Sequence, residues 1–255
     1  MDLAIHTQGL RREFGTFVAV DGIDLAVPRG SLYGFVGPNG AGKSTTIKCL
    51  TGLLKPSGGT MRILGLDPLA SPEATKRQVG VVPEDLALFE HLTAAETLAF
   101  VGQVHGLPAA TIRSRTAELL ALMDLTSASG QLVADYSHGM RKKASLAAAL
   151  LPAPKLLFLD EPFEGIDAIA SRQIKDLLLE YVKRGGTVFL TSHILEVVER
   201  LCDHIGVIHR GRLVAQGPIG ALRAATEGSE TLEAMFLRLV GATEGAAAHL
   251  DWLSG

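Results

Sequence analysis

Short apolar runs bounded by glycine, proline or charged residues recur in the first 92 residues and again after residue 151. Runs of this length between turn signals are typical of buried strands in a parallel sheet. The sequence therefore predicts core strands over Leu32 to Val36, Val79 to Val82, Leu156 to Leu159 and Thr187 to Thr191.

The N-terminal segment predicts a second, smaller group of strands. Leu3 to Leu10 and Val20 to Val27 are predicted strands, and Phe14-Gly15-Thr16 forms a tight turn between them. Thr60 to Gly65 is a later strand that we expect to return to the same group. The chain therefore begins with a small antiparallel β-layer that precedes the core sheet.

Apolar positions at helical spacing dominate from Thr93 to Asp135. Thr93 and Glu96 have the spacing of a capping box, so we expect a helix to begin there. The predicted core of this helical insertion consists of Leu98, Val101, Leu119, Leu120 and Leu122. Helices are predicted over Thr45 to Leu54, Pro72 to Arg77, Thr93 to Gly106, Pro108 to Leu122, Arg141 to Leu151, Ile169 to Val182, Pro218 to Ala225 and Glu230 to Leu239, with a closing hairpin over Ile205 to His209 and Leu213 to Ala215.

Composition narrows the class of protein only slightly. The net charge of −3 over 255 residues argues against a protein that coats nucleic acid. Cys49 and Cys202 cannot form a disulfide framework, so we interpret both as small core residues of a protein in a reducing compartment. We expect no secretion leader at Met1 and no membrane span, because the most apolar stretch, Ala144 to Leu159, contains two prolines and a lysine.

The first predicted core strand leads directly into Gly37-Pro38-Asn39-Gly40-Ala41-Gly42-Lys43-Ser44, and a predicted helix follows from Thr45. This stretch fits G-x-x-x-x-G-K-[ST] at every fixed position, in the strand–loop–helix context that a phosphate-binding loop requires. Glycines let successive backbone N–H groups point at phosphate oxygens, and the helix N-terminus adds partial positive charge. Lys43 is expected to reach the β- and γ-phosphates, and the Ser44 hydroxyl to ligate Mg²⁺.

Polar side chains follow two further predicted core strands at the point where each strand ends. Asp160 and Glu161 follow Leu156 to Leu159, and Ser192-His193 follows Thr187 to Thr191. Ligands of open α/β sheets bind beyond the carboxyl ends of the strands, so these residues are expected beside the phosphate loop. Asp160 is predicted to hold Mg²⁺ through water, Glu161 to take a proton from the attacking water, and His193 to lie near the γ-phosphate.

With these motifs in order, the chain resembles the ATP-binding subunit of an ABC transporter over roughly its first 220 residues. Gly37 to Ser44 matches the Walker A motif, Leu156 to Asp160 matches Walker B, and Glu161 and His193 match the catalytic glutamate and the switch histidine. The same resemblance assigns further residues: Phe14 to the aromatic loop that stacks on adenine, Glu84 to the Q-loop and the metal, Ser137 and Gly139 to the signature motif, and Asp167 to the D-loop.

The resemblance implies an α/β fold: a P-loop NTPase core with a mixed sheet, an N-terminal antiparallel β-layer and an inserted α-helical subdomain. It implies a single ABC ATPase domain over residues 1–225, with a RecA-like core at 1–92 and 152–225 and a helical insertion at about 93–151. Residues 226–255 are then a short C-terminal helix and tail.

Three positions depart from the family pattern. The Q-loop usually has Gln, but this chain has Glu84; the D-loop usually begins with Ser, but this chain has Glu164; and the signature reads Tyr136-Ser137-His138-Gly139-Met140 in place of Leu-Ser-Gly-Gly-Gln. The first and third departures resemble the exporter branch often called ABC-2 type, whose motor subunit is a chain separate from its membrane subunit.

The family mechanism implies two partners and no nucleic acid. A second ATP-binding subunit, most simply an identical chain, supplies Ser137 and Gly139 to the ATP held by the first, so that two ATP molecules join two chains head to tail. A transmembrane permease subunit then holds the pair at the cytoplasmic face of the membrane. We expect the permease to contact the segment from Glu84 to Leu92, with Phe89 at the centre because aromatic side chains are enriched at interface cores.

Two alternatives remain open at this point. One is a soluble ABC-type ATPase that acts on ribosomes or DNA, although such proteins carry two cassettes or a long coiled-coil insertion. The other is a subunit that binds ATP without hydrolysing it, against which stand Lys43, Asp160, Glu161 and His193. Leu86 and Leu92 are equally compatible with packing on the helical insertion, and the transported substrate is not indicated.

Overall fold

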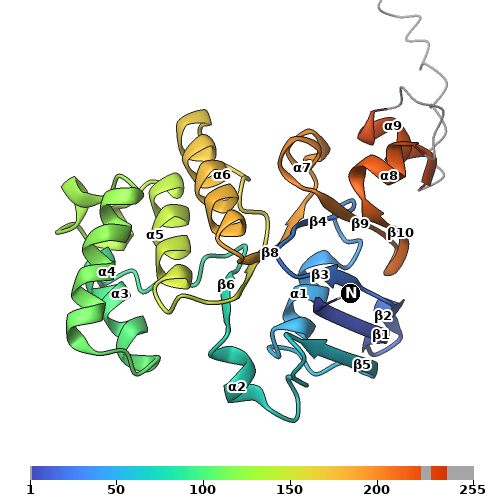
Figure 1. The fold of residues 1–255 in the computed structure, drawn as a ribbon, viewed down its shortest axis with the longest axis horizontal. Helices are drawn as coiled ribbons and strands as arrows, with labels where there is room; N and C mark the ends of the chain where they lie inside the picture. Colours follow the sequence, from blue (N-terminus) through green and yellow to red (C-terminus); the bar gives the residue numbers. More distant parts are fainter. Residues whose placement is uncertain (1, 225–230, 240–255) are drawn as a thin grey trace, which may run out of the picture.

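The computed structural model describes residues 2–224 and 231–239, in which helices surround a central sheet and a second sheet lies beside it (Figure 1). The tail from Gly241 to Gly255 lies outside the described residues, as do Ala225 and Glu230 at the ends of two predicted helices. Within the described ranges, the central sheet has the order β10-β9-β4-β8-β7-β6. Its strands are β4 (Leu32–Val36), β6 (Val79–Val82), β7 (Leu156–Leu159), β8 (Thr187–Ser192), β9 (His204–His209) and β10 (Arg212–Pro218).

The central sheet is mixed, as predicted. β4 pairs in parallel with β8 and β9, and β7 pairs in parallel with β6 and β8, whereas β10 is antiparallel to β9. All five residues of β4 are buried; Leu32 and Val36 belong to one apolar cluster, and Tyr33 and Phe35 belong to the other. Because both faces of the sheet are covered there, the inner parallel strands β4, β7 and β8 are buried at every position rather than alternately.

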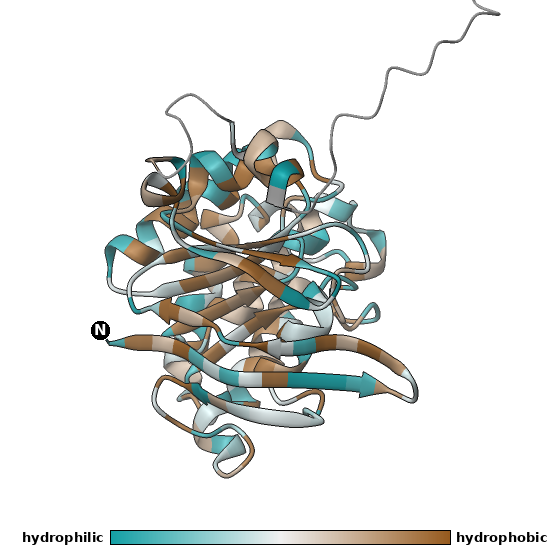
Figure 2. Cartoon of the chain, turned by 90° about the vertical axis from the view of Figure 1, so that its right-hand side faces the viewer, coloured by the Kyte–Doolittle hydropathy of each residue, from teal (hydrophilic) through white to brown (hydrophobic). Residues whose placement is uncertain are grey.

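The second sheet is the predicted N-terminal antiparallel layer. Its strand β1 (Leu3–Phe14) pairs with β2 (Phe17–Ile23), β3 (Ala26–Pro28) and β5 (Gly58–Ile63). Figure 2 shows the β1–β2 hairpin, along which hydrophilic and hydrophobic residues alternate more than in the central strands. β1 extends four residues further than predicted, so that Phe14 and Phe17 face each other across the turn.

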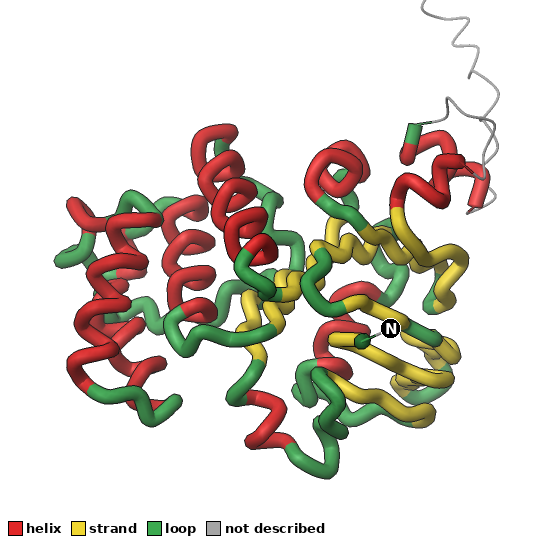
Figure 3. The backbone as a smooth tube through the Cα atoms, viewed as in Figure 1, coloured by secondary structure: helices red, strands yellow, loops and turns green. Residues whose placement is uncertain are grey.

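Three longer helices of the segment between β6 and β7 lie together beyond β6, the edge strand of the central sheet (Figure 3). These are α3 (Ala94–Val104), α4 (Ala109–Leu122) and α5 (His138–Leu150), with short 3-10 turns at Thr126–Ala128 and Val133–Asp135. The remaining helices are α1 (Lys43–Leu50), α2 (Pro72–Lys76), α6 (Ala168–Lys183), α7 (Leu195–Leu201), α8 (Ile219–Ala224) and α9 (Leu232–Leu239).

The caps explain where the helices of this segment begin. The Thr93–Glu96 capping box is present, with the Thr93 hydroxyl accepting from the Glu96 N–H and the Glu96 carboxylate accepting from the Thr93 N–H. Ser137 caps α5 by accepting from the Met140 N–H, so α5 begins at His138 and not at the predicted Arg141. A serine cap satisfies an end N–H of the helix and so sets its first turn.

Two expectations about helices were wrong. Leu122 is not a core residue: it is the last residue of α4 and is 55% exposed, while Leu98 and Leu120 are buried as predicted. Helix α7 was not predicted at all, because only Val198 and Leu201 are buried in its seven residues, too few to establish a helical period.

The two cysteines are buried and unpaired, as expected for core residues. Burial raises the pKa of the Cys49 thiol to about 11, and it raises the pKa of the Cys202 thiol further. Among the described helices, none combines the length and the hydropathy that a bilayer crossing requires.

Candidate functional site

The phosphate-binding loop connects the C-terminus of β4 to the N-terminus of α1. Lys43, the first residue of α1, is 6% exposed, and its ammonium donates to the Gly37 carbonyl at 2.9 Å and to the Pro38 carbonyl at 3.4 Å. Gly42 has a φ of 108°, and a Cβ atom at this position would lie 2.4 Å from the Ala19 carbonyl oxygen. Only glycine fits there, so the loop passes closely over β2.

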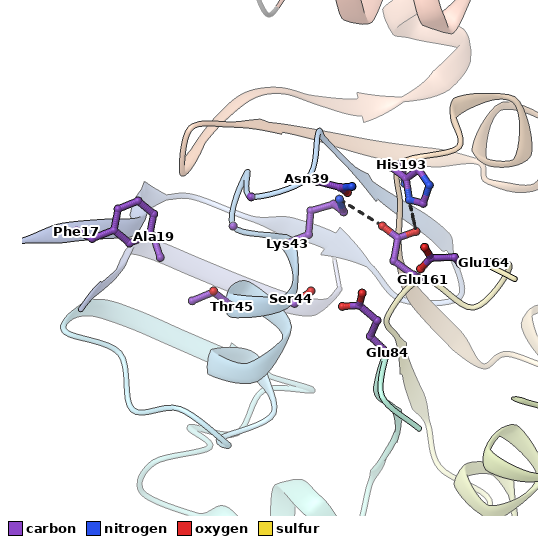
Figure 4. Close-up of a pocket in the computed structure, with 12 residues that line it drawn as sticks. Phe17, Ala19, Asn39, Lys43, Ser44, Thr45, Glu84, Glu161, Glu164 and His193 are labelled. Carbon is purple, nitrogen blue, oxygen red and sulfur yellow. Dashed lines mark hydrogen bonds and ion pairs between the residues drawn. The ribbon is translucent and has the colours of Figure 1, made fainter. Parts of the chain in front are cut away.

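A cavity of about 350 Å³ opens beside this loop, and Figure 4 shows the side chains that line it. It receives residues from β2, the phosphate loop, α1, the segment after β6, the segment after β7 and the end of β8. Its lining consists of Phe17, Ala19, Asn39, Gly40, Gly42, Lys43, Ser44, Thr45, Glu84, Glu161, Glu164 and His193.

Glu161 is held by partners on both sides of its carboxylate. Its Oε1 lies 3.3 Å from the Lys43 ammonium, and its Oε2 lies 3.0 Å from His193 Nδ1 and accepts from the His193 backbone N–H at 3.3 Å (Figure 4). Glu161 is 5% exposed. A carboxylate fixed in this way, at the edge of a cavity with a buried lysine, is placed to accept a proton from a molecule in the cavity.

Asp160 is oriented by a neighbour on the next strand. Its Oδ1 accepts a hydrogen bond from the Thr191 hydroxyl at 2.5 Å, and Thr191 Oγ1 in turn accepts from the Glu161 backbone N–H at 3.0 Å. Thr191 therefore fixes both acids at once. Thr191 was not among the predicted site residues; the available signal was a hydroxyl residue just before Ser192-His193, after the apolar run Val188-Phe189-Leu190.

A second cavity of about 630 Å³ lies next to the first, and Glu84 and Glu164 line both. Asp160 lines the second cavity together with two cations, Lys48 and Lys142. Glu84 follows the edge strand β6, so it stands between the two cavities near the ends of the strands that carry the other acids.

The comparisons with known proteins agree with this architecture. A family model described as ABC transporter matches residues 20–164. The daunorubicin/doxorubicin resistance ATP-binding protein DrrA of Streptomyces peucetius is 40% identical, over 97% of this chain and 78% of its own length. The chain belongs to the ABC transporter ATP-binding family. It is an ATPase.

Two further proteins similar to this ABC ATPase are a transport ATP-binding protein and an ATP-binding subunit of an ABC transporter. The bacitracin transport ATP-binding protein BcrA of Bacillus licheniformis is 36% identical, over 88% of this chain and 72% of its own length. A solved ATP-binding subunit of an ABC transporter is 31% identical with a TM-score of 0.86, and the match covers 92% of this chain and 99% of that one. ATP is therefore the nucleotide that the domain binds.

The structure of this ABC ATPase brings some of the predicted site residues together. Lys43, Ser44, Thr45, Glu84, Glu161 and His193 all line the first cavity, with Asn39, Gly40 and Gly42 of the phosphate loop. Asp160 lies in the adjoining cavity, next in the chain to Glu161. Gly37, Pro38 and Ala41 complete the loop: the carbonyls of Gly37 and Pro38 accept from Lys43, and the Ala41 N–H donates to the Pro38 carbonyl.

Other predicted residues do not line the first cavity. Phe14 is 45% exposed at the end of β1, with the Arg12 guanidinium 4.4 Å from its ring centre, and it is Phe17 that forms the cavity wall. Ser137 is exposed at the start of α5. Asp167 caps α6 through the N–H groups of Ile169 and Ala170, and these backbone hydrogen bonds, chiefly the one from Ala170, lower the pKa of its carboxyl.

Gly139 and His138 approach the loop before α6 within the same chain. A Cβ atom on Gly139 would lie 3.8 Å from Asp167 Oδ2, and one on Gly165 would lie 3.1 Å from the His138 ring. Among the described residues, therefore, the predicted signature segment lies beside the predicted D-loop, and no residue of that segment lines the first cavity.

The residues present fit a Mg²⁺ ion that arrives with ATP. The described residues contain no cluster of three or more His, Cys, Asp or Glu side chains that could hold a metal unaided. Mg²⁺ commonly takes one or two protein ligands and completes its shell with water and phosphate oxygens. The Ser44 hydroxyl and the carboxylates of Asp160 and Glu84 are hard oxygen donors of this kind at the cavity edge.

Proposed function

We propose that this chain binds ATP with Mg²⁺ in the first cavity, hydrolyses it between two subunits, and so drives export through a separate membrane-spanning subunit. The observation that carries the assignment of the site is the joint position of Lys43, Glu161 and His193. These three residues follow β4, β7 and β8, and they meet through contacts of 3.0 and 3.3 Å around one buried carboxylate.

The chemistry assigned to these residues is attack of water on the γ-phosphorus of ATP. A new bond joins the water oxygen to phosphorus, the bond from phosphorus to the bridging oxygen breaks, and the products are ADP and phosphate. Glu161 takes the proton of the attacking water, and His193 keeps the carboxylate oriented. Lys43 exchanges its contacts with loop carbonyls for phosphate oxygens, which supports the charge of the transferred group.

In this proposal Mg²⁺ is held by Ser44 and by Asp160 through water, with Glu84 beside it, and it supplies charge neutralisation between the phosphates. The role of the protein is to keep the oxygen atoms of these side chains in position. Thr191 orients Asp160, because its hydroxyl donates a hydrogen bond at 2.5 Å to one oxygen of the Asp160 carboxylate. With that oxygen fixed, the position of the other carboxylate oxygen is also set.

The adenine is assigned to the tip of the β1–β2 hairpin, with Phe14 as its stacking platform. A cavity of about 350 Å³ holds the phosphates but ends at Phe17 and Ala19, so the base projects past them along the hairpin. Stacking requires a ring that is held in place. The Arg12 guanidinium holds the Phe14 ring, whereas Phe17 has no ring or cation contact within the described part of the chain.

Phe14→Ala is therefore expected to weaken ATP binding about 10-fold, because stacking of a base on an aromatic ring contributes roughly 1–3 kcal/mol. Phe17→Ala serves as the matched control and is expected to change the affinity less than threefold. Isothermal titration with ATP and with tripolyphosphate measures both, and tripolyphosphate affinity is expected to stay the same in both variants. A loss confined to Phe17→Ala would transfer the stacking role to Phe17.

The second subunit supplies what the single chain lacks. Ser137 is exposed and Gly139 lies by the D-loop, so neither contacts the phosphate loop of its own chain. We assign both residues, with Asp167, to the ATP held by a second copy. Two chains arranged head to tail then close two sites around two ATP molecules, and hydrolysis releases them, a shift between two states driven by ligand.

Export is supported by the relatives. They include DrrA, which is a drug resistance protein, a Nod factor export protein of Ralstonia nicotianae, and BcrA, a bacitracin transport protein. We infer that this chain powers the same direction of transport from the cytoplasmic face of the membrane, bound there through its permease. The membrane subunit selects the substrate. A soluble ATPase acting on ribosomes or DNA is disfavoured, since none of these relatives is described as one.

A groove of about 360 Å³ offers the docking place for the permease. It lies between the end of α1, β6 with the segment after it, and helices α3 and α5. Leu86 is buried in one apolar cluster with Leu98 and Leu120 of the helical insertion, as the alternative reading of Leu86 expects. Phe89 is 51% exposed and meets Phe100, which is 44% exposed, edge to face at 5.1 Å. Phe89 lines the groove, and an exposed aromatic side chain on a groove wall favours a partner contact there.

The transport part of the proposal is tested with Phe89→Asp. Basal ATPase activity of the isolated subunit is expected to stay within about twofold of wild type, because Phe89 lies outside the ATP cavity. Co-purification with the membrane subunit is expected to be lost, and mass spectrometry should find the exported compound retained in the cells and absent from the medium.

Leu122→Asp is the matched control, since Leu122 is 55% exposed on the same helical segment and does not line the groove. It should leave both co-purification and export intact. If Phe89→Asp unfolds the isolated subunit, Phe89 is a core residue and the docking site is wrong. If wild-type cells deplete the compound from the medium, the direction of transport is import.

A further inference from the structure

The backbone of Glu161 is in a conformation that non-glycine residues seldom adopt. Its φ is +48°, in the left-handed region, where the Cβ atom crowds the following carbonyl. Residues held in this region persist only where their surroundings impose it, and they gather at functional sites. Two hydrogen bonds from other elements impose it here: the Glu161 N–H donates to Thr191 Oγ1 at 3.0 Å, and the Glu161 carbonyl accepts from the Lys142 ammonium at 2.5 Å.

Lys142 is an unusual lysine. It lies in the first half of α5 and is 3% exposed. Its ammonium is buried against the loop that follows β7, where it donates to the Glu161 carbonyl. Lysine is almost never fully buried unless it is paired. Burial lowers the pKa of Lys142, and four carboxylates oppose that effect, Glu164 foremost and then Glu161, Glu84 and Asp160. The ammonium is therefore the common counter-charge of the acids that surround the two cavities.

The only other donor to the Glu161 carbonyl among the described residues is the Glu164 N–H, at 3.3 Å. That bond lies inside the loop itself, so it moves with the loop and cannot fix it to another element. Lys142 is different, because α5 is packed as a separate helix of the segment between β6 and β7. The hydrogen bond from Lys142 therefore ties the backbone of Glu161 to an element outside the loop.

We propose that Lys142 is a positioning residue for hydrolysis: by holding the Glu161 carbonyl it maintains the backbone turn that directs the Glu161 carboxylate between Lys43 and His193. The inference rests on the proposed function, in which Glu161 is the general base. This role of Lys142 couples the position of α5 to the position of the base. Because Ser137 caps α5 and Lys142 lies on α5, a shift of α5 relative to the central sheet changes the direction of the Glu161 carboxylate.

The variant Lys142→Met removes the hydrogen bond and the charge while keeping an unbranched side chain. We expect kcat to fall about 10–100-fold, the effect of a small misplacement of a catalytic group, with KM for ATP and ATP affinity within about threefold of wild type. Lys142→Arg, which keeps a cationic donor, is expected to restore most of kcat. Lys143→Met is the matched control, since Lys143 is the next residue of α5, is also buried, and faces Gln173 of α6 at 3.4 Å.

A double-mutant cycle separates positioning of Glu161 from a general structural role. Single-turnover hydrolysis is measured for wild type, Lys142→Met, Glu161→Gln and the double variant, with unfolding followed by circular dichroism. If Lys142 acts through Glu161, Lys142→Met lowers the rate in the wild-type background and has almost no effect in the Glu161→Gln background. If Lys142→Met does not fold, Lys142→Gln takes its place in the same cycle.

Three results overturn the inference. One is an equal loss from Lys142→Met in both backgrounds, another is no loss in either, and the third is an equal loss from Lys143→Met. These leave the proposed function intact as long as Glu161→Gln is itself inactive. Near-normal turnover of Glu161→Gln would instead defeat the assignment of the base, and this inference with it.

Discussion

Glu161→Gln is expected to lower steady-state ATP turnover by about 10²–10⁴-fold, the usual contribution of a positioned general base, while ATP affinity stays near the wild-type value. The amide keeps the shape of the side chain and its packing against Lys43 and His193, but it cannot accept the proton of the attacking water. Binding, which depends on the phosphate loop, remains. ATP should then accumulate in a closed dimer that does not proceed to products.

Phosphate release and size-exclusion chromatography with and without ATP measure the two effects. Glu180→Gln is the matched control: the same replacement on the exposed face of α6, where Glu180 forms an ion pair with Arg184 at 2.7 Å, should leave turnover and the monomer–dimer equilibrium unchanged. Near-normal turnover in Glu161→Gln would move the base elsewhere, and Glu164, which lines the same cavity, would be the next residue to replace.

The second large effect is recovery of activity from two inactive chains. Lys43→Ala removes the phosphate-binding cation, and Ser137→Arg blocks the signature, so each variant alone is expected to lose nearly all turnover. A mixed dimer carries both defects in one site and neither defect in the other. With random mixing and independent sites, the mixture should regain up to about a quarter of wild-type turnover.

The matched control for this experiment comes from the contact between Lys43 and Glu161. These side chains lie 3.3 Å apart in one chain, so they serve the same site. Mixing Lys43→Ala with Glu161→Gln therefore damages both sites of the mixed dimer, and no activity should return. Recovery in this control, or its absence in the Lys43→Ala and Ser137→Arg mixture, would contradict a signature that acts across the dimer.

The residues that sequence reasoning found lie beyond the carboxyl ends of core strands: Glu161 and His193 follow β7 and β8, and Lys43 follows β4 through the phosphate loop. Lys43, Glu161 and His193 were predicted to meet because the carboxyl ends of neighbouring parallel strands lie at one edge of a sheet. The structure brings them together, since β4 and β7 both pair with β8. The parallel strands of the central sheet were predicted correctly because uninterrupted apolar runs indicate strands covered on both faces, whereas the mixed sheet and the N-terminal antiparallel layer came with the family resemblance.

Sequence reasoning could not find Lys142. In the Arg141-Lys142-Lys143 run of a helix, the sequence pattern does not distinguish a buried lysine from a solvated one. Lys142 is buried because α5 packs against the loop that follows β7. Phe17 was also missed as a cavity residue, because the register of the β1–β2 hairpin decides which aromatic ring faces the cavity, and the predicted stacking role of Phe14 stays a prediction. Leu122 shows the reverse error: its spacing suited a core position, but α4 ends there and leaves the side chain in solvent.

The position of β4 has a consequence for how the chain is made. Leu32 of β4 pairs with Val188 of β8, more than 150 residues later, and Tyr33 pairs with His204. At ribosomal rates of roughly 5–20 residues per second, β4 therefore waits on the order of 10–30 s for its first sheet neighbour to be synthesised. During that interval β4 has neither of its neighbours in the central sheet beside it, and the segment that becomes α3 to α5 is already complete. The nascent chain is thus exposed to chaperones and proteases, with the apolar strand β4 unpaired, until almost the whole domain has left the ribosome.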